Sequence, residues 1–163
     1  MAVIEETLQA NQAYASAFTK SHLPMPPGRK LAVVVCMDAR IDPARALGLE
    51  EGDAHVIRNA GGRISEALRS LTISQLLLGT EEVAVIHHTD CGMLTFTDDS
   101  LRKDVRQKLH ADADHIAFLP FSDVEQSVKD DLVQYRQSTI VRQDIPVRGF
   151  VYDVKTGRLT EVN

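Results

Sequence analysis

Cysteine is scarce in this sequence: only Cys36 and Cys91 occur among 163 residues. Two cysteines cannot build the dense disulfide framework of small secreted domains. In a reducing compartment such thiols are core residues, nucleophiles or metal ligands. Which of these roles the two cysteines have is the question that decides function.

Long apolar runs and an excess of positive charge are also missing. No stretch approaches the roughly 18–20 consecutive apolar residues of a membrane span. The first residues, MAVIEETLQA, carry Glu5 and Glu6 where a signal peptide would have positive charge. The 18 Lys and Arg against 23 Asp and Glu give a net charge of −5, which argues against a nucleic-acid footprint. We therefore expect a cytoplasmic protein with no nucleic-acid and no membrane partner.

The length and composition of the sequence are those of one globular domain. At 44% hydrophobic and 25% charged residues the composition is ordinary, and we find no internal repeat or low-complexity tract. A chain of this size buries about two-thirds of the surface that it exposes when unfolded. We therefore expect a self-sufficient core.

Three runs rich in apolar and β-branched residues alternate with patterns typical of helices. The runs LAVVVC (31–36), AHVIR (54–58) and EVAVIHH (82–88) predict strands, and a helix over 65–78 ends before Gly79. Two helices over 98–111 and 122–137 follow, and the chain closes with a strand, a turn at 155–157 and a second strand. Strand–helix–strand order predicts the α/β class: a single domain whose mostly parallel central β-sheet is flanked by helices.

The N-terminal segment is set apart by proline. Residues 3–20 form an amphipathic pattern with Ile4, Leu8, Ala15 and Phe18 near one face. Three prolines then break any helix before residue 28, at Pro24, Pro26 and Pro27. The sequence therefore divides into an N-terminal helix with its connector (1–27) and an α/β domain (28–163). From the pattern alone the helix packs equally well on a partner subunit or on its own domain.

Three candidate metal ligands follow two of the predicted strands. Cys36 ends the first strand, and His88 and Cys91 stand at and just beyond the end of EVAVIHH. Ligands of open parallel sheets gather outside the carboxyl ends of the strands, so adjacent strands would bring these side chains together. Two thiolates and one imidazole suit zinc.

Each of these residues also has a structural interpretation. A lone cysteine in an apolar strand is more often a core residue, and a lone His-x-x-Cys is a weak metal signal. Their joint placement, which uses every cysteine, favours metal. Since no third thiolate exists, a closed site needs a fourth ligand from His87, Asp38, Asp90 or another group, and otherwise a position is left for water.

Two short motifs beside these residues could assist the chemistry. Asp38 and Arg40 follow Cys36, and the pair could orient metal-bound water, ligate the metal through Asp38, or form a surface ion pair of little consequence. The segment Asn59-Ala60-Gly61-Gly62-Arg63 is a tight turn or an anion site in which the amides of Gly61 and Gly62 receive substrate. Neither the dinucleotide fingerprint nor the phosphate-binding loop occurs.

Together, Cys36-x-Asp38-x-Arg40, Asn59-Ala60-Gly61-Gly62 and His88-x-x-Cys91-Gly92 resemble the β-class carbonic anhydrases. RNAGGR, RSLTISQLLLGT and IHHTDCGM look like the short bacterial and mycobacterial branch of that class. The resemblance covers residue 28 to the C-terminus, and the initial helix also suits the family. Three motifs in the family's order make it specific.

The resemblance implies one zinc ion per chain, held by Cys36, His88 and Cys91. It implies that zinc-bound hydroxide, oriented by Asp38 and Arg40, hydrates carbon dioxide reversibly to bicarbonate and a proton, and that Asp38 can instead bind the metal in an inactive form. It also implies a homodimer or tetramer in which the N-terminal helix extends onto a partner subunit. Two alternatives remain: hydrolysis of carbonyl sulfide or carbon disulfide on the same zinc site, and a zinc-stabilised binding protein without catalysis.

Overall fold

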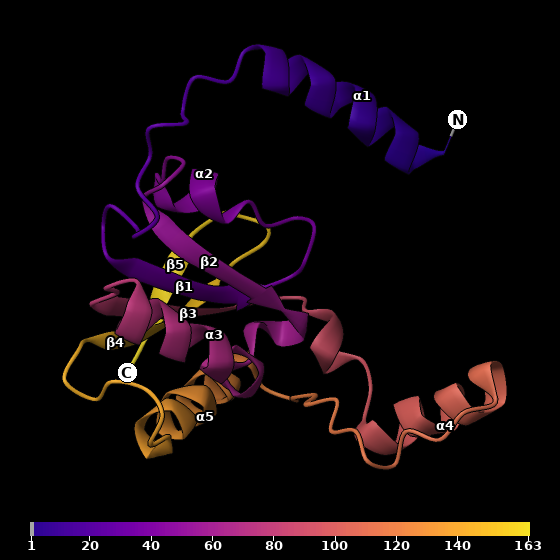
Figure 1. Ribbon diagram of the computed structural model, residues 1–163. Helices are drawn as coiled ribbons and strands as arrows, with labels where there is room; N and C mark the ends of the chain where they lie inside the picture. The colour runs from indigo at the N-terminus through magenta and orange to yellow at the C-terminus, as the bar shows by residue number, and fades with distance from the viewer. Residues whose placement is uncertain (1) are drawn as a thin grey trace.

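A five-stranded sheet forms the centre of the computed structural model, which describes residues 2–163 (Figure 1). Its strand order is β2-β1-β3-β4-β5. The first four strands pair in parallel and β5 is antiparallel to β4. The strands are β1 (Leu31–Cys36), β2 (Ala54–Asn59), β3 (Glu82–His88), β4 (Val147–Tyr152) and β5 (Leu159–Val162). The predicted α/β class is confirmed, and β1 and β3 are neighbours, as the prediction of the site requires.

Strand β1 is buried on both faces because its apolar residues alternate between two cores. Ala32 and Val34 face one side of the sheet, where they join the larger core. Val33 and Val35 face the other side, in a core that also contains both cysteines. A continuous β-branched run is the pattern expected of such a central strand.

Two helices cover the first face and one short helix lies on the second. The larger core is closed by α3 (Ile64–Leu77) and α5 (Val124–Gln137), which lie side by side beneath the sheet in Figure 1. The short helix α2 (Pro43–Leu47) begins at Asp42, whose side chain accepts a hydrogen bond from the amide of Arg45. It lies between the first two predicted strands, where the sequence pattern predicts no helix, because five residues are too few for a periodic signal.

Two other helices stand away from the sheet. Neither α1 (Val3–Ser16) nor α4 (Asp98–Leu109) contains a buried residue, and Figure 1 shows both extending from the body of the domain. Helix α1 ends four residues before the predicted boundary. Beyond it Lys20 pairs with Glu51, and the hydroxyl of Tyr14 donates to the same carboxylate at 2.7 Å. These contacts tie the end of α1 to the loop before β2.

Across residues 2–163 we find no helix with the length and apolar character needed to cross a bilayer.

Candidate metal centre

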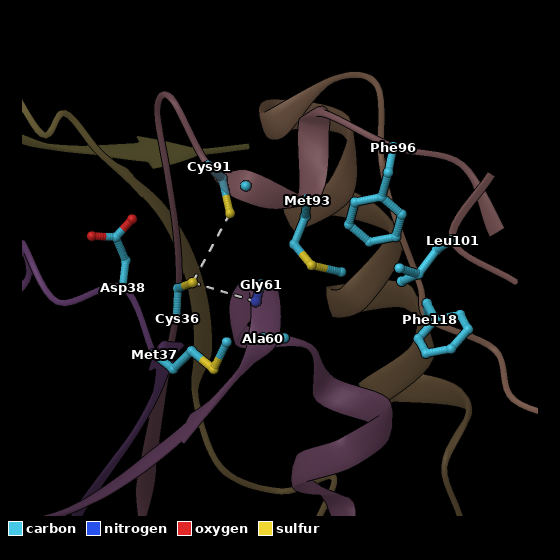
Figure 2. Close-up of a pocket in the computed structure, with 11 residues that line it drawn as sticks. Cys36, Met37, Asp38, Ala60, Gly61, Cys91, Met93, Phe96, Leu101 and Phe118 are labelled. Carbon is cyan, nitrogen blue, oxygen red and sulfur yellow. Dashed lines mark hydrogen bonds between the residues drawn. The ribbon is translucent and has the colours of Figure 1, made fainter. Parts of the chain in front are cut away.

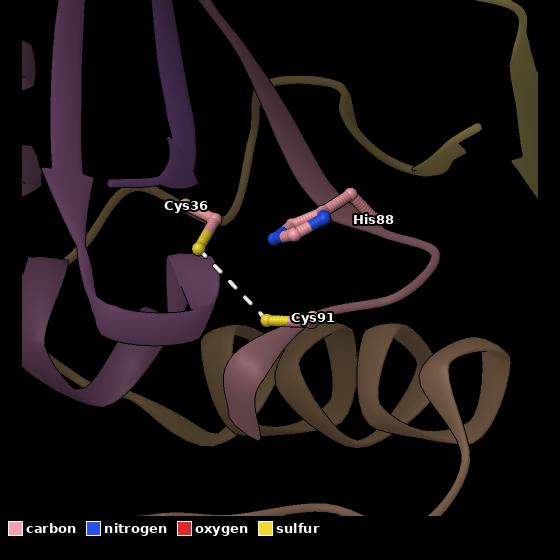
Figure 3. A group of neighbouring side chains, drawn as sticks. All are labelled: Cys36, His88 and Cys91. Atoms are coloured by element: carbon pink, nitrogen blue, oxygen red, sulfur yellow. Dashed lines mark hydrogen bonds between the residues drawn. The ribbon is translucent and has the colours of Figure 1, made fainter. Parts of the chain in front are cut away.

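Cys36, His88 and Cys91 meet at the carboxyl ends of two adjacent strands. Cys36 is the last residue of β1, His88 is the last residue of β3, and Cys91 follows after a short turn. One ligand atom from each lies within 4.8 Å of the others, and the two sulfurs are 3.9 Å apart (Figure 3). All three side chains are buried. The predicted proximity of these side chains is therefore confirmed.

The imidazole of His88 is already oriented as a ligand. Its Nδ1 donates to the carbonyl of Thr89 at 2.9 Å, which leaves Nε2 directed toward the two sulfurs. This Nε2 is buried and has no hydrogen-bond partner. A buried polar atom without a partner is costly, so a ligand that satisfies Nε2 stabilises the site.

The electrostatics of the three groups favour a cation between them. The sulfurs of Cys36 and Cys91 are within hydrogen-bond distance of each other at 3.9 Å, and Cys36 Sγ also accepts from the amide of Gly61 at 3.3 Å. These contacts lower the pKa of the Cys36 thiol, and the contact between the two sulfurs raises the pKa of Cys91. Burial lowers the pKa of His88, but the Cys36 sulfur, the Thr89 carbonyl and Asp38 together outweigh burial, so the net pKa is raised. A divalent cation would neutralise two thiolates here.

The donor set fits zinc in its chemistry. Two sulfurs and one imidazole nitrogen are the ligands that zinc prefers, and catalytic zinc sites have three protein ligands and an open position. Within residues 2–163, no fourth His, Cys, Asp or Glu belongs to the group. These three residues can therefore hold a metal and leave a position for water.

Asp38 lies at the margin of this group. Its Oδ2 is 3.7 Å from Nε2 of His88. Arg40 donates to Asp38 from Nε at 3.0 Å and from a terminal nitrogen at 2.8 Å, and its backbone amide adds a third bond at 2.8 Å. These bonds hold the pKa of the Asp38 carboxyl well below its ordinary value. Asp38 is therefore a fixed carboxylate beside the three candidate ligands, and its role as an orienting group, as a ligand or as an ion-pair partner alone stays a prediction.

Two further contacts at this edge were missed from the sequence. Arg58, on β2, donates to the carbonyls of Cys36 and Asp38 and so fixes the turn that carries them. Asp90 accepts from Arg40 at 2.7 Å through its carboxylate and at 2.8 Å through its carbonyl. These hydrogen bonds join residues 20 to 50 positions apart in the sequence, so no local sequence pattern predicts them.

The turn Asn59-Ala60-Gly61-Gly62-Arg63, which follows β2, contacts the site at Cys36. Asn59 closes the turn with two side-chain hydrogen bonds to the backbone of Arg63. Gly61 presents its amide to the Cys36 sulfur and lines the cavity beside the metal position. Gly62 does not reach this cavity: its α-carbon packs on the backbone of β1 and β3. The predicted contact of these glycines with substrate stays a prediction.

His87 faces away from the metal position, because successive residues of a strand point to opposite faces. Its Nδ1 lies 2.7 Å from the hydroxyl of Ser127, and its Nε2 lies 3.2 Å from a carboxylate oxygen of Asp131. The ring stacks on Phe121. His87 is therefore a buried structural residue and does not belong to the ligand group.

A cavity of about 420 Å³ opens beside the two cysteines. Figure 2 shows Cys36, Asp38 and Cys91 on one side and apolar side chains on the other. The apolar wall comes from the segments after β3 and around α4, and consists of Met93, Phe96, Leu101 and Phe118. Such a cavity admits a small, uncharged substrate to the metal position.

An α/β fold that brings two thiols and an imidazole together at the ends of adjacent strands is that of a protein with a candidate metal site. Comparison with known proteins identifies the family: the family model for carbonic anhydrase matches residues 31–159. The chain belongs to the carbonic anhydrase family, in its β class.

Three relatives illustrate the range of similarity. Beta-carbonic anhydrase 1 of Mycobacterium tuberculosis is 45% identical over 99% of both chains. The crystal structure of a carbonic anhydrase from Streptococcus mutans superposes with a TM-score of 0.95 and 46% identity, covering 100% of this chain and 99% of that one. A carbon disulfide hydrolase of Acidianus sp. is 30% identical, over 98% of this chain and 89% of its own.

Proposed function

We propose that the protein is a zinc-dependent carbonic anhydrase that hydrates carbon dioxide reversibly to bicarbonate and a proton. One observation carries the proposal: a buried, unpartnered His88 Nε2 faces two thiols beside an arginine-held carboxylate. The relatives at 45–46% identity named as carbonic anhydrases support the same activity. Cys36, His88 and Cys91 would hold one zinc ion per chain.

Zinc held by these three residues would supply Lewis-acid chemistry that activates water near neutral pH. Asp38, kept ionised by Arg40, would accept a hydrogen bond from the attacking water and fix the direction of its attack. The apolar wall of the cavity excludes competing water and accommodates carbon dioxide. Gly61 lines the cavity, although its amide donates to the Cys36 sulfur, so contact of Gly61 with the product anion is our candidate, and Gly62, which does not line the cavity, would act only by supporting the turn.

The rest of the proposal concerns assembly and location. We propose that residues 1–27 form a dimerisation arm and that residues 28–163 form the zinc-binding domain. The exposed α1, with Ile4 and Leu8 uncovered, supports a homodimer or a tetramer built from dimers.

A cytoplasmic location agrees with the cysteine ligands, since a reducing compartment keeps thiols available for metal.

Hydrolysis of carbon disulfide is the second candidate. Relatives named as carbon disulfide hydrolases are 28–31% identical to this chain, a lower identity than that of the carbonic anhydrases. The same three ligands and the same apolar cavity suit this linear, uncharged substrate, as they suit carbonyl sulfide. Headspace sulfide release, compared with proton release from carbon dioxide, separates the two activities.

Stopped-flow hydration of carbon dioxide combined with metal analysis tests the proposal. The parent should contain one zinc per chain and release protons rapidly. Cys36→Ser should lose both zinc and activity, because it removes a thiolate ligand. Asp38→Asn should keep zinc but lose at least about tenfold in kcat, because the nucleophile is no longer oriented. A parent that binds zinc without turning over either substrate would be the zinc-stabilised binding protein, and an Asp38→Asn variant as fast as the parent would refute the role of Asp38.

A further inference from the structure

Asp90 stands in the turn between two ligands yet is directed away from them. Its backbone has φ of 54°, a left-handed conformation that Asp and Asn tolerate better than most residues. The side chain is 71% exposed, and its Oδ2 accepts a hydrogen bond from Arg40 at 2.7 Å. A second nitrogen of Arg40 donates to the Asp90 carbonyl at 2.8 Å. Asp90 therefore contacts Arg40 through both its side chain and its backbone.

Arg40 joins the two loops that follow β1 and β3, the strands that end at Cys36 and His88. Nε and one terminal nitrogen bind Asp38, in the loop after β1. The other terminal nitrogen binds the carboxylate of Asp90, in the loop after β3. Every nitrogen of the guanidinium thus has a carboxylate partner, although the side chain is 47% exposed. Removal of the Asp90 carboxylate would leave one terminal nitrogen of Arg40 without a carboxylate partner, while the bonds to Asp38 and to the Asp90 carbonyl remain.

We propose that Asp90 is a positioning residue that acts through Arg40 to hold Asp38 in its catalytic orientation. The inference rests on the proposed function, and assigns to Asp90 a role outside the ligand set. Ion pairs this exposed contribute little to stability, so the effect of Asp90 is on geometry. Without the Asp90 carboxylate, one terminal nitrogen of Arg40 donates to water instead, and Arg40 restrains the position of Asp38 less strongly. The freed Asp38 oxygen starts only 3.7 Å from Nε2 of His88, near the metal position.

Two substitutions at residue 90 separate its side chain from its backbone. Asp90→Gly keeps the left-handed conformation and removes the carboxylate. Asp90→Asn keeps the conformation and one acceptor oxygen for Arg40. We expect zinc content and KM to remain near parental values in both. The kcat should fall about tenfold in Asp90→Gly and should be largely rescued in Asp90→Asn, since altered support of a metal site costs about this much.

The same variants in an Asp38→Asn background give the deciding comparison. If Asp90 acts through Arg40 on Asp38, Asp90→Gly should change kcat less than about twofold there, because coupled residues are not additive. Cobalt-substituted protein gives a readout independent of turnover, since the d–d absorption reports the ligands. That spectrum should differ between Asp90→Gly and the parent, and the difference should vanish in the Asp38→Asn background.

Each contrary outcome has a distinct meaning. Parental kcat and an unchanged cobalt spectrum in Asp90→Gly would overturn the inference. So would a loss that persists in full in the Asp38→Asn background, since Asp90 would then act on the Cys91 turn itself. If the parent hydrates no carbon dioxide, the proposed function fails, but the cobalt comparison still decides the role of Asp90. Failure of the parent to bind cobalt would overturn both.

Discussion

At the scale of single residues, Gly62 is the glycine on which the metal centre most depends. A Cβ at this position would lie 2.9 Å from the amide nitrogen of Cys36 and 2.9 Å from the carbonyl oxygen of Ile86, and φ is +70°. Both neighbours are backbone atoms of central strands and cannot give way. Gly62→Ala should therefore lower the free energy of unfolding by about 3 kcal/mol, measured by urea denaturation, and weaken zinc binding.

Gly79 provides the matched control for this prediction. Its φ is +73°, but nothing lies within 4 Å of an added Cβ. Gly79→Ala should cost about 1 kcal/mol, the conformational penalty alone, and should leave zinc binding unchanged. Equal losses in the two variants would show that backbone conformation, and not contact with β1 and β3, limits residue 62.

The cluster of Cys36, His88 and Cys91 could be predicted from the sequence because two local signals locate its members. Cys36 and His88 end apolar strands, and parallel strands place their carboxyl ends at one edge. The support around them could not be predicted in the same way. Arg58 and Asp90 act through long side chains or turns that cross between loops, and hydrogen bonds across 20 to 50 residues leave no periodicity.

At the scale of elements, the contact of α5 with β4 depends on Gly149. A Cβ here would collide with Val128 and would lie 2.9 Å from Cδ1 of Leu132, both on α5. Gly149→Ala should therefore destabilise the fold by about 2 kcal/mol through overpacking. Adding Val128→Ala provides room for the new methyl group, so the double variant should lose less than the sum of the two single losses. Strict additivity in urea denaturation would contradict this account of the packing.

Elements with a strong pattern were predicted closely and the short ones were not. Strand β3 has the predicted bounds, and β2 extends one residue further. Helix α2 was missed, since it has only five residues between its N-cap Asp42 and its left-handed C-cap Gly48. Helix α1 was overextended because Phe18 continues its apolar pattern, although the chain leaves the helix at Ala17. The contacts of Tyr14 and Lys20 with Glu51 join residues more than 30 positions apart and are not part of the local pattern.

At the scale of the whole molecule, one domain leaves two helices unsupported. The sheet and its two cores account for the burial of both strand faces, but within residues 2–163 neither α1 nor α4 has a fully buried residue, and every side chain of α1 is exposed. An isolated helix of 14 residues is marginal in water, so packing must supply its stability. The anchor of α1 on Glu51 sets its direction and leaves its apolar side uncovered. This supports the proposal that a second copy of the chain covers it.

Charge placed on that apolar side tests the proposed arm. Leu8 is 61% exposed, and Ile4 lies one turn before it on the same side. If a partner subunit covers this side, Leu8→Glu buries a charge without a partner and should raise the dimer dissociation constant at least about tenfold, measured by sedimentation. Ala13→Glu adds the same charge on the opposite side of α1 and should leave the constant within about twofold. If both variants sediment as the parent does, α1 is not a dimerisation arm; if both dissociate, net charge and not the apolar contact governs assembly.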